Sequence, residues 1–113
     1  MPVTNEKVAE RVFLARLYGD DYFPNHLLDR GGAILRGLCE RIEAERPADL
    51  PALYVLTHGA TEEFNLLGEA LDEAGSEIET VAREEIAEDF WFIATAYGFE
   101  GADIEELIAP REW

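Results

Sequence analysis

The stretch GSEIETVAREEIAEDFWFIATAYG, residues 75–98, decides the fold of this chain. Its hydrophobic residues recur at steps of three and four, which is the spacing of one face of an α-helix. Ser76 followed by Glu79 predicts an N-terminal capping box, and Gly98 is typical of a helix C-terminus, where glycine adopts the left-handed conformation at little cost. We therefore predict a long helix over residues 76–98. Its apolar face consists of Ile78, Val81, Ala82, Ile86, Phe90, Ile93 and Tyr97.

Two carboxylates interrupt this apolar face. At about 100° per residue, Glu85 and Asp89 project into its middle, whereas Trp91 projects nearly opposite to it. A buried acid needs a hydrogen-bonding or ionic partner. We expect those partners to be polar groups of the preceding helix or an arginine. The candidates are Tyr54, Thr57, Thr61, Asn65, Arg30 and Arg36.

The same periodicity predicts two more long helices. The first covers about residues 25–46 and ends before Pro47, because a proline disfavours helical backbone in the residue that precedes it. The second covers about residues 50–73, with Asp49 as its N-cap and Pro51 in its first turn. The connection between them is only a few residues long, so we expect the two helices to be antiparallel neighbours.

Short helices are expected at both ends of the chain. Thr4 or Asn5 can cap a helix that runs to about Leu17, and Asp103 can cap another one near the C-terminus. No alternation of polar and apolar residues is long enough to predict a strand. The predicted fold is therefore all-α. We expect an antiparallel bundle of three long helices with a short N-terminal and a short C-terminal helix, in a single helical domain over residues 1–113.

The charge of the chain is large and unevenly distributed. Its net charge is −16 at pH 7, and residues 58–113 contain sixteen acids but only two bases, Arg83 and Arg111. Binding to a nucleic-acid backbone needs clustered lysine and arginine, so we do not expect it here. An acidic half attracts a basic protein surface or a cation, although the same bias also serves solubility.

Several other classes of protein are disfavoured by what the sequence lacks. No apolar run approaches the roughly 18 residues of a membrane span. The N-terminus lacks the apolar region of a signal peptide, so we expect a cytoplasmic protein. The single Cys39 excludes an internal disulfide and a multi-cysteine metal site. No phosphate loop, nucleophile elbow, HExxH sequence or dinucleotide fingerprint is present, and we expect no cofactor.

Two interpretations of function remain open. In the first, the chain is a non-catalytic adaptor or neutralising module that binds a basic protein through its acidic half. The candidate residues on the last long helix are Glu77, Glu84, Glu88 and Trp91. In the second, the chain is an enzyme that holds a metal or small ligand between the third and fourth predicted helices, which cover residues 50–73 and 76–98. The candidates for that site are Thr57, His58, Thr61, Glu62, Glu85 and Asp89.

The spacing of these residues disfavours a metal. Helical bundles that bind two metal ions use a Glu-x-x-His step on several helices, whereas His58 and Glu62 are four residues apart. Neighbours at that spacing do share one side of a helix, as do Glu85 and Asp89. We therefore predict a polar cluster or a ligand site between the two helices rather than a metal centre.

Five strings carry a family resemblance: YFP at 22–24, THGATEEFN at 57–65, GSEIETVAREEIAEDF at 75–90, AYGF at 96–99 and IEELIAPREW at 104–113. They resemble a family of small acidic bacterial proteins that is carried as a domain of unknown function. The resemblance extends over nearly the whole chain and implies an all-helical bacterial protein. It brings no known activity, so it assigns no catalytic residue. Gly59 and Trp91 depart from the pattern expected for that family.

Overall fold

A computed structural model describes residues 3–113 of the chain, and they form helices joined by loops and turns. The elements in order are α1 (Glu6–Glu10), the 3₁₀ turn η1 (Ala15–Leu17), α2 (Asn25–Glu45), α3 (Leu50–Glu73), α4 (Thr80–Ala96) and α5 (Ile104–Leu107). The predicted all-α class is confirmed, as are the three long helices that pack against one another. Among the described residues, no helix combines the length and apolar content needed to cross a bilayer.

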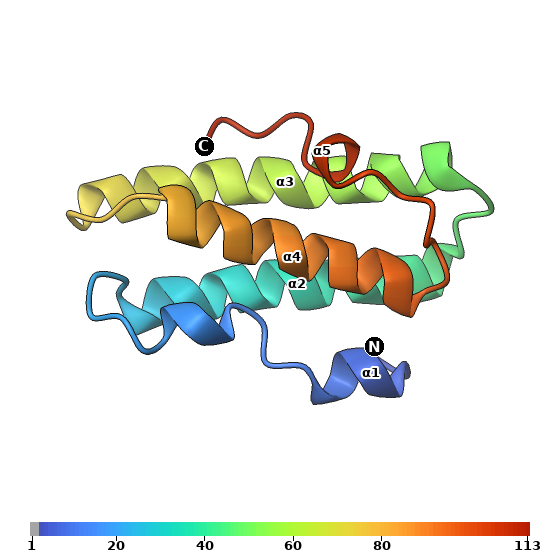
Figure 1. Cartoon of the computed structure of the whole chain (residues 1–113), viewed down its shortest axis with the longest axis horizontal. Coiled ribbons are helices and arrows are strands. Elements are labelled where there is room, and N and C mark those ends of the chain that lie inside the picture. Colours follow the sequence, from blue (N-terminus) through green and yellow to red (C-terminus); the bar gives the residue numbers. More distant parts are fainter. Residues whose placement is uncertain (1–2) are drawn as a thin grey trace.

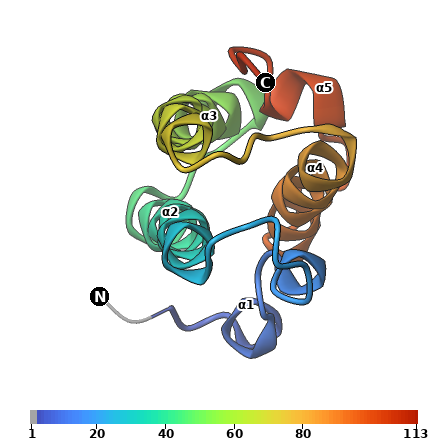
Figure 2. The same cartoon turned by 90° about the vertical axis from the view of Figure 1, so that its left-hand side faces the viewer.

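The long helices are arranged in two layers. α2 and α3 lie side by side and antiparallel, and α4 packs on one side of that pair (Figure 1, Figure 2). Residues 3–17, here called the N-terminal segment, lie along the edge formed by α2 and α4, and α5 lies beside α3 and α4 (Figure 2). The opposite face of the α2–α3 pair carries no further element of the described chain (Figure 2).

The hydrophobic core fills the space between these layers. The rings of Phe64 in α3 and Phe90 in α4 are both fully buried, with their centroids 5.9 Å apart. Leu35 and Cys39 present the apolar stripe of α2 to the same core, and both are 0% exposed. Burial of such stripes supplies most of the stability of helices in a folded domain.

Local sequence signals set several helix ends as predicted. Asp49 caps α3 by accepting the Ala52 N–H at 3.0 Å, and Asp103 caps α5 by accepting the Glu105 N–H at 2.9 Å. Gly98 adopts φ +88°, the left-handed conformation expected just after a helix. These ends depend on groups within a few residues of each other, which is why the sequence alone indicates them.

The predicted start of the last long helix is wrong. Ser76 does not cap it, and α4 begins at Thr80 instead. Gly75 has φ +84°, and the Ser76 N–H donates to the carbonyl of Leu71 at 2.8 Å, so Ser76 takes part in ending α3. Residues 76–79 form no regular element, and they carry the chain from the α2–α3 layer to the layer of α4.

The predicted N-terminal helix is also too long. Asn5 does cap α1, but this helix ends at Glu10, and Arg11 is already extended. Leu14 then adopts the left-handed conformation, with φ 58°, before the short turn η1. A continuous helix would have tied up the backbone N–H groups of residues 14–16, and two of these groups bond to carboxylates of α4.

Candidate functional site

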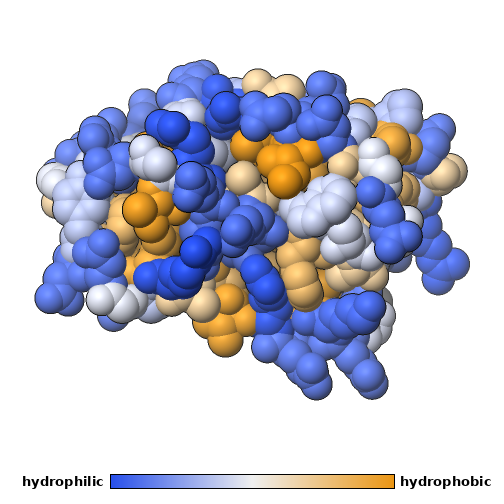
Figure 3. Space-filling model, viewed as in Figure 1, coloured by the Kyte–Doolittle hydropathy of each residue, from blue (hydrophilic) through white to orange (hydrophobic). Residues whose placement is uncertain are grey.

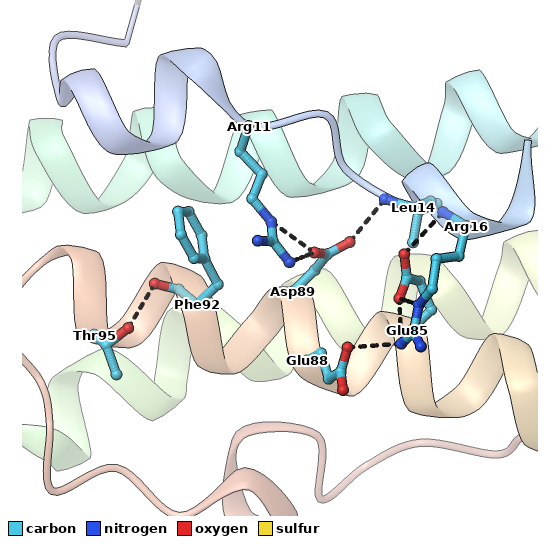
Figure 4. Close-up of polar contacts among 8 residues, drawn as sticks. All are labelled: Arg11, Leu14, Arg16, Glu85, Glu88, Asp89, Phe92 and Thr95. Atoms are coloured by element: carbon cyan, nitrogen blue, oxygen red, sulfur yellow. Dashed lines mark hydrogen bonds and ion pairs between the residues drawn. The ribbon is translucent and has the colours of Figure 1, made fainter.

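The buried acids of α4 bind the N-terminal segment, as the close-up shows (Figure 4). Asp89 is 0% exposed. Its Oδ1 accepts from Nε of Arg11 at 3.1 Å and from Nη2 of Arg11 at 2.8 Å, while its Oδ2 accepts from the Leu14 N–H at 2.8 Å. Burial raises the pKa of Asp89, and the Leu14 N–H and the Arg11 guanidinium oppose that rise. The Arg11 guanidinium also lies 4.2 Å from the centre of the Phe92 ring.

Glu85 makes a parallel link one turn earlier on α4 (Figure 4). It is 4% exposed and accepts from Nε of Arg16 at 2.7 Å and from the Arg16 N–H at 3.1 Å. The same guanidinium reaches Glu88 at 2.7 Å. All three of these acid–base pairs join the N-terminal segment to α4, so the cluster fastens this segment to the helix.

The prediction that an arginine pairs with the buried acids is confirmed, but the arginines are Arg11 and Arg16 rather than Arg30 or Arg36. The prediction that polar groups of α3 serve as partners is wrong. Thr57 donates to the carbonyl of Tyr54 at 3.2 Å, and Thr61 donates to the carbonyls of Thr57 at 2.8 Å and Leu107 at 3.3 Å. The polar seam of α3 does exist, but it faces the α5 region. The acids of α4 face the other way because the N-terminal segment supplies both arginines and unpaired backbone N–H groups.

The second predicted cluster is divided between two places. Nε2 of His58 lies 2.7 Å from the carbonyl of Glu106 near α5, and Glu62 is exposed on α3. Asp89 and Glu85 lie under the N-terminal segment. Within residues 3–113, no group of three or more His, Cys, Asp and Glu side chains is placed to hold a metal ion.

Sequence reasoning overlooked a third carboxylate with several partners, Glu43 of α2. It accepts from the Tyr97 hydroxyl at 2.5 Å, from the Thr4 N–H and hydroxyl at 2.9 Å each, and from the Asn5 N–H at 3.1 Å. Asn5 also donates its side-chain amide to the carbonyl of Ala96 at 2.9 Å. The sequence signal that could have indicated Glu43 is its position four residues after Cys39, which places it beside the apolar stripe of α2. Glu43 holds the start of the N-terminal segment against α2 and α4.

The pKa of Glu43 makes this contact a source of acid sensitivity. The Tyr97 hydrogen bond lowers that pKa to about 2 against the contrary effect of burial, and the bonds from Thr4 and Asn5 add to the lowering. A lowered folded-state pKa contributes stability above the unfolded value, and this contribution is lost as the pH falls through the folded value. We predict that Glu43→Gln is less stable than the wild type at neutral pH. The difference should narrow between about pH 4.5 and about pH 2 in denaturant unfolding.

A control separates this effect from general acid unfolding. Glu40→Gln removes an exposed acid one turn earlier on the same helix, and its stability difference from the wild type should change little across that range. A difference for Glu43→Gln that stays constant down to pH 2 would show that the carboxylate charge contributes nothing.

A concave acidic site lies on the other side of the molecule, between α3 and the residues that follow α5. We call it the acidic groove. It is a hollow of about 290 Å³ lined by Asn65, Gly68, Glu69, Asp72, Glu77, Ile78, Glu112 and Trp113. Its four carboxylates, Glu69, Asp72, Glu77 and Glu112, are exposed, and none forms an ion pair within residues 3–113.

Asn65 builds one wall of the acidic groove. Its amide donates to the carbonyl of Pro110 at 3.1 Å, and its Oδ1 accepts the Glu112 N–H at 2.8 Å. The Trp113 ring packs edge-on against Phe64, with the centroids 6.3 Å apart, and its indole Nε1 is buried without a hydrogen-bond partner in the described chain. The residues after α5 are therefore held on α3, with an indole and a carboxylate beside the α3 acids.

The four residues predicted to bind a partner are placed differently from one another, and Glu77 precedes α4 instead of lying on it. Glu77 lines the acidic groove. Glu84 is exposed, whereas Glu88 is exposed but already paired with Arg16. Trp91 is partly buried and packs on the core rather than standing free. On the face formed by α4 and α5, hydrophilic residues cover most of the surface and separate the hydrophobic patches (Figure 3).

The fold and the groove together define a small all-α protein with a strongly acidic concave site. Comparison with protein families matches residues 7–113 to one described as a family of unknown function (DUF5713). The chain belongs to this family, which confirms the resemblance read from its sequence. No curated protein and no solved structure shows significant similarity to the chain.

Proposed function

We propose that this protein is a non-catalytic binding module that engages a basic segment of another protein through the acidic groove. The observation that carries the proposal is the set of four exposed carboxylates, Glu69, Asp72, Glu77 and Glu112, around one hollow without a neutralising base. An adaptor or a neutralising protein would use such a site. The proposed setting is the cytoplasm of a bacterium, in keeping with the composition and the family resemblance of the sequence.

The ion pairs within the chain favour the groove, rather than other acidic parts of the surface, as the binding site for a basic partner. Arg11 and Arg16 pair with Asp89, Glu85 and Glu88 of α4, and Arg111 pairs with Glu105 at 3.3 Å. None of these bases reaches the groove. Like charges held near one another raise the local negative potential, which attracts a cationic side chain and speeds its association.

The indole of Trp113 adds a second element of recognition. A lysine or arginine side chain can lie against an aromatic ring while its charged end meets carboxylates. Trp113 and Ile78 provide apolar surface inside a hollow whose rim is acidic. This combination suits a side chain with an apolar stem and a positive end, such as lysine or arginine.

Binding of a lysine-rich peptide tests the proposal. The groove variant carries Glu69→Gln, Asp72→Asn, Glu77→Gln and Glu112→Gln. At about 0.5 kcal/mol for each exposed ion pair, it should bind the peptide about 30-fold more weakly and with a shallower salt dependence. Affinity is measured by titration calorimetry at several salt concentrations.

A matched variant controls for net charge. It neutralises Glu10, Glu40, Glu100 and Glu106, which are exposed and lie outside the groove. This control should keep the affinity of the wild type within about threefold, because screened charges farther than a Debye length contribute little. Equal loss of affinity in both variants would show that the peptide senses only the overall charge, and the groove would lose its role.

A further inference from the structure

The side of the α2–α3 pair that faces away from α4 exposes apolar residues. We call it the outer face and define it by Arg30, Ala33, Ile34 and Arg41 of α2 and Val55, Gly59, Glu62, Glu63 and Leu66 of α3. Val55 is 71% exposed and Leu66 is 62% exposed. They are eleven residues apart, about three helical turns, so they lie on one side of α3. Figure 2 shows that no described element covers this side.

The outer face is shaped as a shallow trough. One hollow is lined by Arg30, Ala33, Ile34, Glu63 and Leu66, and a second one by Glu45, Pro47, Ala52, Val55 and Leu56. Between them, a Cβ atom added to Gly59 would meet only Nη1 of Arg41, at 3.5 Å. A Cβ atom added to Gly37 would meet nothing within 4 Å. The middle of the face is therefore low, and it can admit side chains of an opposing surface.

The charges on this face differ from those elsewhere. α2 contributes two bases, Arg30 and Arg41, and α3 contributes two acids, Glu62 and Glu63. None of the four forms an ion pair with any described residue of the chain. A chain with a net charge of −16 repels its own copies over most of its surface. This face instead offers charges of both signs, two bases against three acids when Glu45 of the second hollow is counted, and none of the five is paired within the described chain.

We propose that the outer face is a twofold interface between two copies of this chain. A twofold axis that runs along the trough, parallel to the helices, places α2 of each copy over α3 of the other. Each residue then faces residues that lie at the same position along the helix axis in the other copy. Arg30 and Glu63 line the same hollow, so Arg30 of each copy comes opposite Glu63 of the other. Leu66 and Ile34 share that hollow and meet across the axis in the same way. The two signs of charge then pair, as a self-complementary interface requires.

The size of the outer face limits the strength of the dimer. The residues that define it run from Arg30 to Arg41 on α2 and from Val55 to Leu66 on α3, which is about 17 Å at a rise of about 1.5 Å per residue. Two helices about 10 Å apart form a face about 20 Å wide, so the outer face covers roughly 350 Å². Standard interfaces bury about 800 Å² on each partner, so we expect a weak dimer that forms at high protein concentration.

Charge reversal with mixing tests the interface. We expect the wild type to sediment as a dimer at millimolar concentration, and R30E and E63R alone should each weaken dimerisation at least tenfold. An equimolar mixture of R30E and E63R should form heterodimers with affinity near that of the wild type, because each Arg–Glu contact becomes a Glu–Arg contact or is retained. L66S should also weaken the dimer, whereas V81S, which changes an equally exposed valine on α4, should not.

Controls with the same charge changes lie on α4. R83E, E84R and their mixture should all dimerise like the wild type, because both residues are exposed and lie outside the outer face. Circular dichroism confirms that each variant is folded. A monomeric wild type at millimolar concentration would overturn the proposal. So would a mixture of R30E and E63R that dimerises no better than either variant alone, or a loss of dimerisation in R83E or E84R alone as large as the loss in R30E or E63R alone.

Discussion

Asp89→Ala should lower the free energy of unfolding by about 3–5 kcal/mol, because removing one member of a buried ion pair leaves the other groups without partners. Two donors lose their acceptor, the Arg11 guanidinium and the Leu14 N–H. Leu14 is 1% exposed and stays in the left-handed conformation only while its surroundings hold it there. Equilibrium unfolding in urea measures the loss.

Two further variants define the cause of that loss. Glu84→Ala changes an exposed acid on the same helix and should stay within about 0.5 kcal/mol of the wild type. Asp89→Asn keeps an acceptor for the Leu14 N–H but loses the charge that faces Arg11, so its stability should lie between those of Asp89→Ala and the wild type. If Asp89→Ala is as stable as Glu84→Ala, the α4 acids do not hold the N-terminal segment.

Gly31→Val should cost about 3 kcal/mol, at the upper end of what overpacking a core costs. A Cβ atom at Gly31 would lie 2.7 Å from Cδ1 of Leu14 and 3.3 Å from both Leu67 and Phe64. Gly31 is therefore the point where α2 comes close to α3 and to the N-terminal segment at once. Thermal unfolding followed by circular dichroism gives the change.

The adjacent residue supplies a matched substitution. A Cβ atom at Gly32 would meet nothing within 4 Å, so Gly32→Val should be neutral or slightly stabilising, since valine has a better helix propensity than glycine. Equal effects of valine at Gly31 and Gly32 would mean that neither packing nor the approach of Leu14 limits the residue at Gly31.

The helix ends that the sequence predicts correctly are those set by residues close by in the sequence. The caps at Asp49 and Asp103 and the left-handed Gly98 each depend on groups within a few positions. The wrong predictions concern residues whose conformation is set by distant contacts. Leu14 leaves the helical conformation to reach Asp89, 75 residues away in the sequence. Ser76 ends α3 instead of starting α4, because the chain must first cross between two layers.

The same distinction between local and distant contacts decides which parts of the candidate site can be predicted from the sequence. The inward direction of Glu85 and Asp89 follows from helical periodicity, and their burial confirms it. Their partners Arg11 and Arg16 could not be chosen over Arg30 and Arg36, since nothing local indicates which loop passes α4. The acidic groove also brings together residues distant in the sequence, because Asn65 fixes the segment that contains Glu112 and Trp113.

Mapping a bound basic peptide by NMR tests the proposed function most directly. Backbone amide shifts are followed while a lysine-rich peptide is added to the isotope-labelled protein. We predict the largest shifts at residues 65–78 and 112–113, together with the indole N–H of Trp113, and their loss at high salt. Largest shifts on α2 or the N-terminal segment, or no saturable shift at low salt, would contradict binding of a basic partner in the acidic groove.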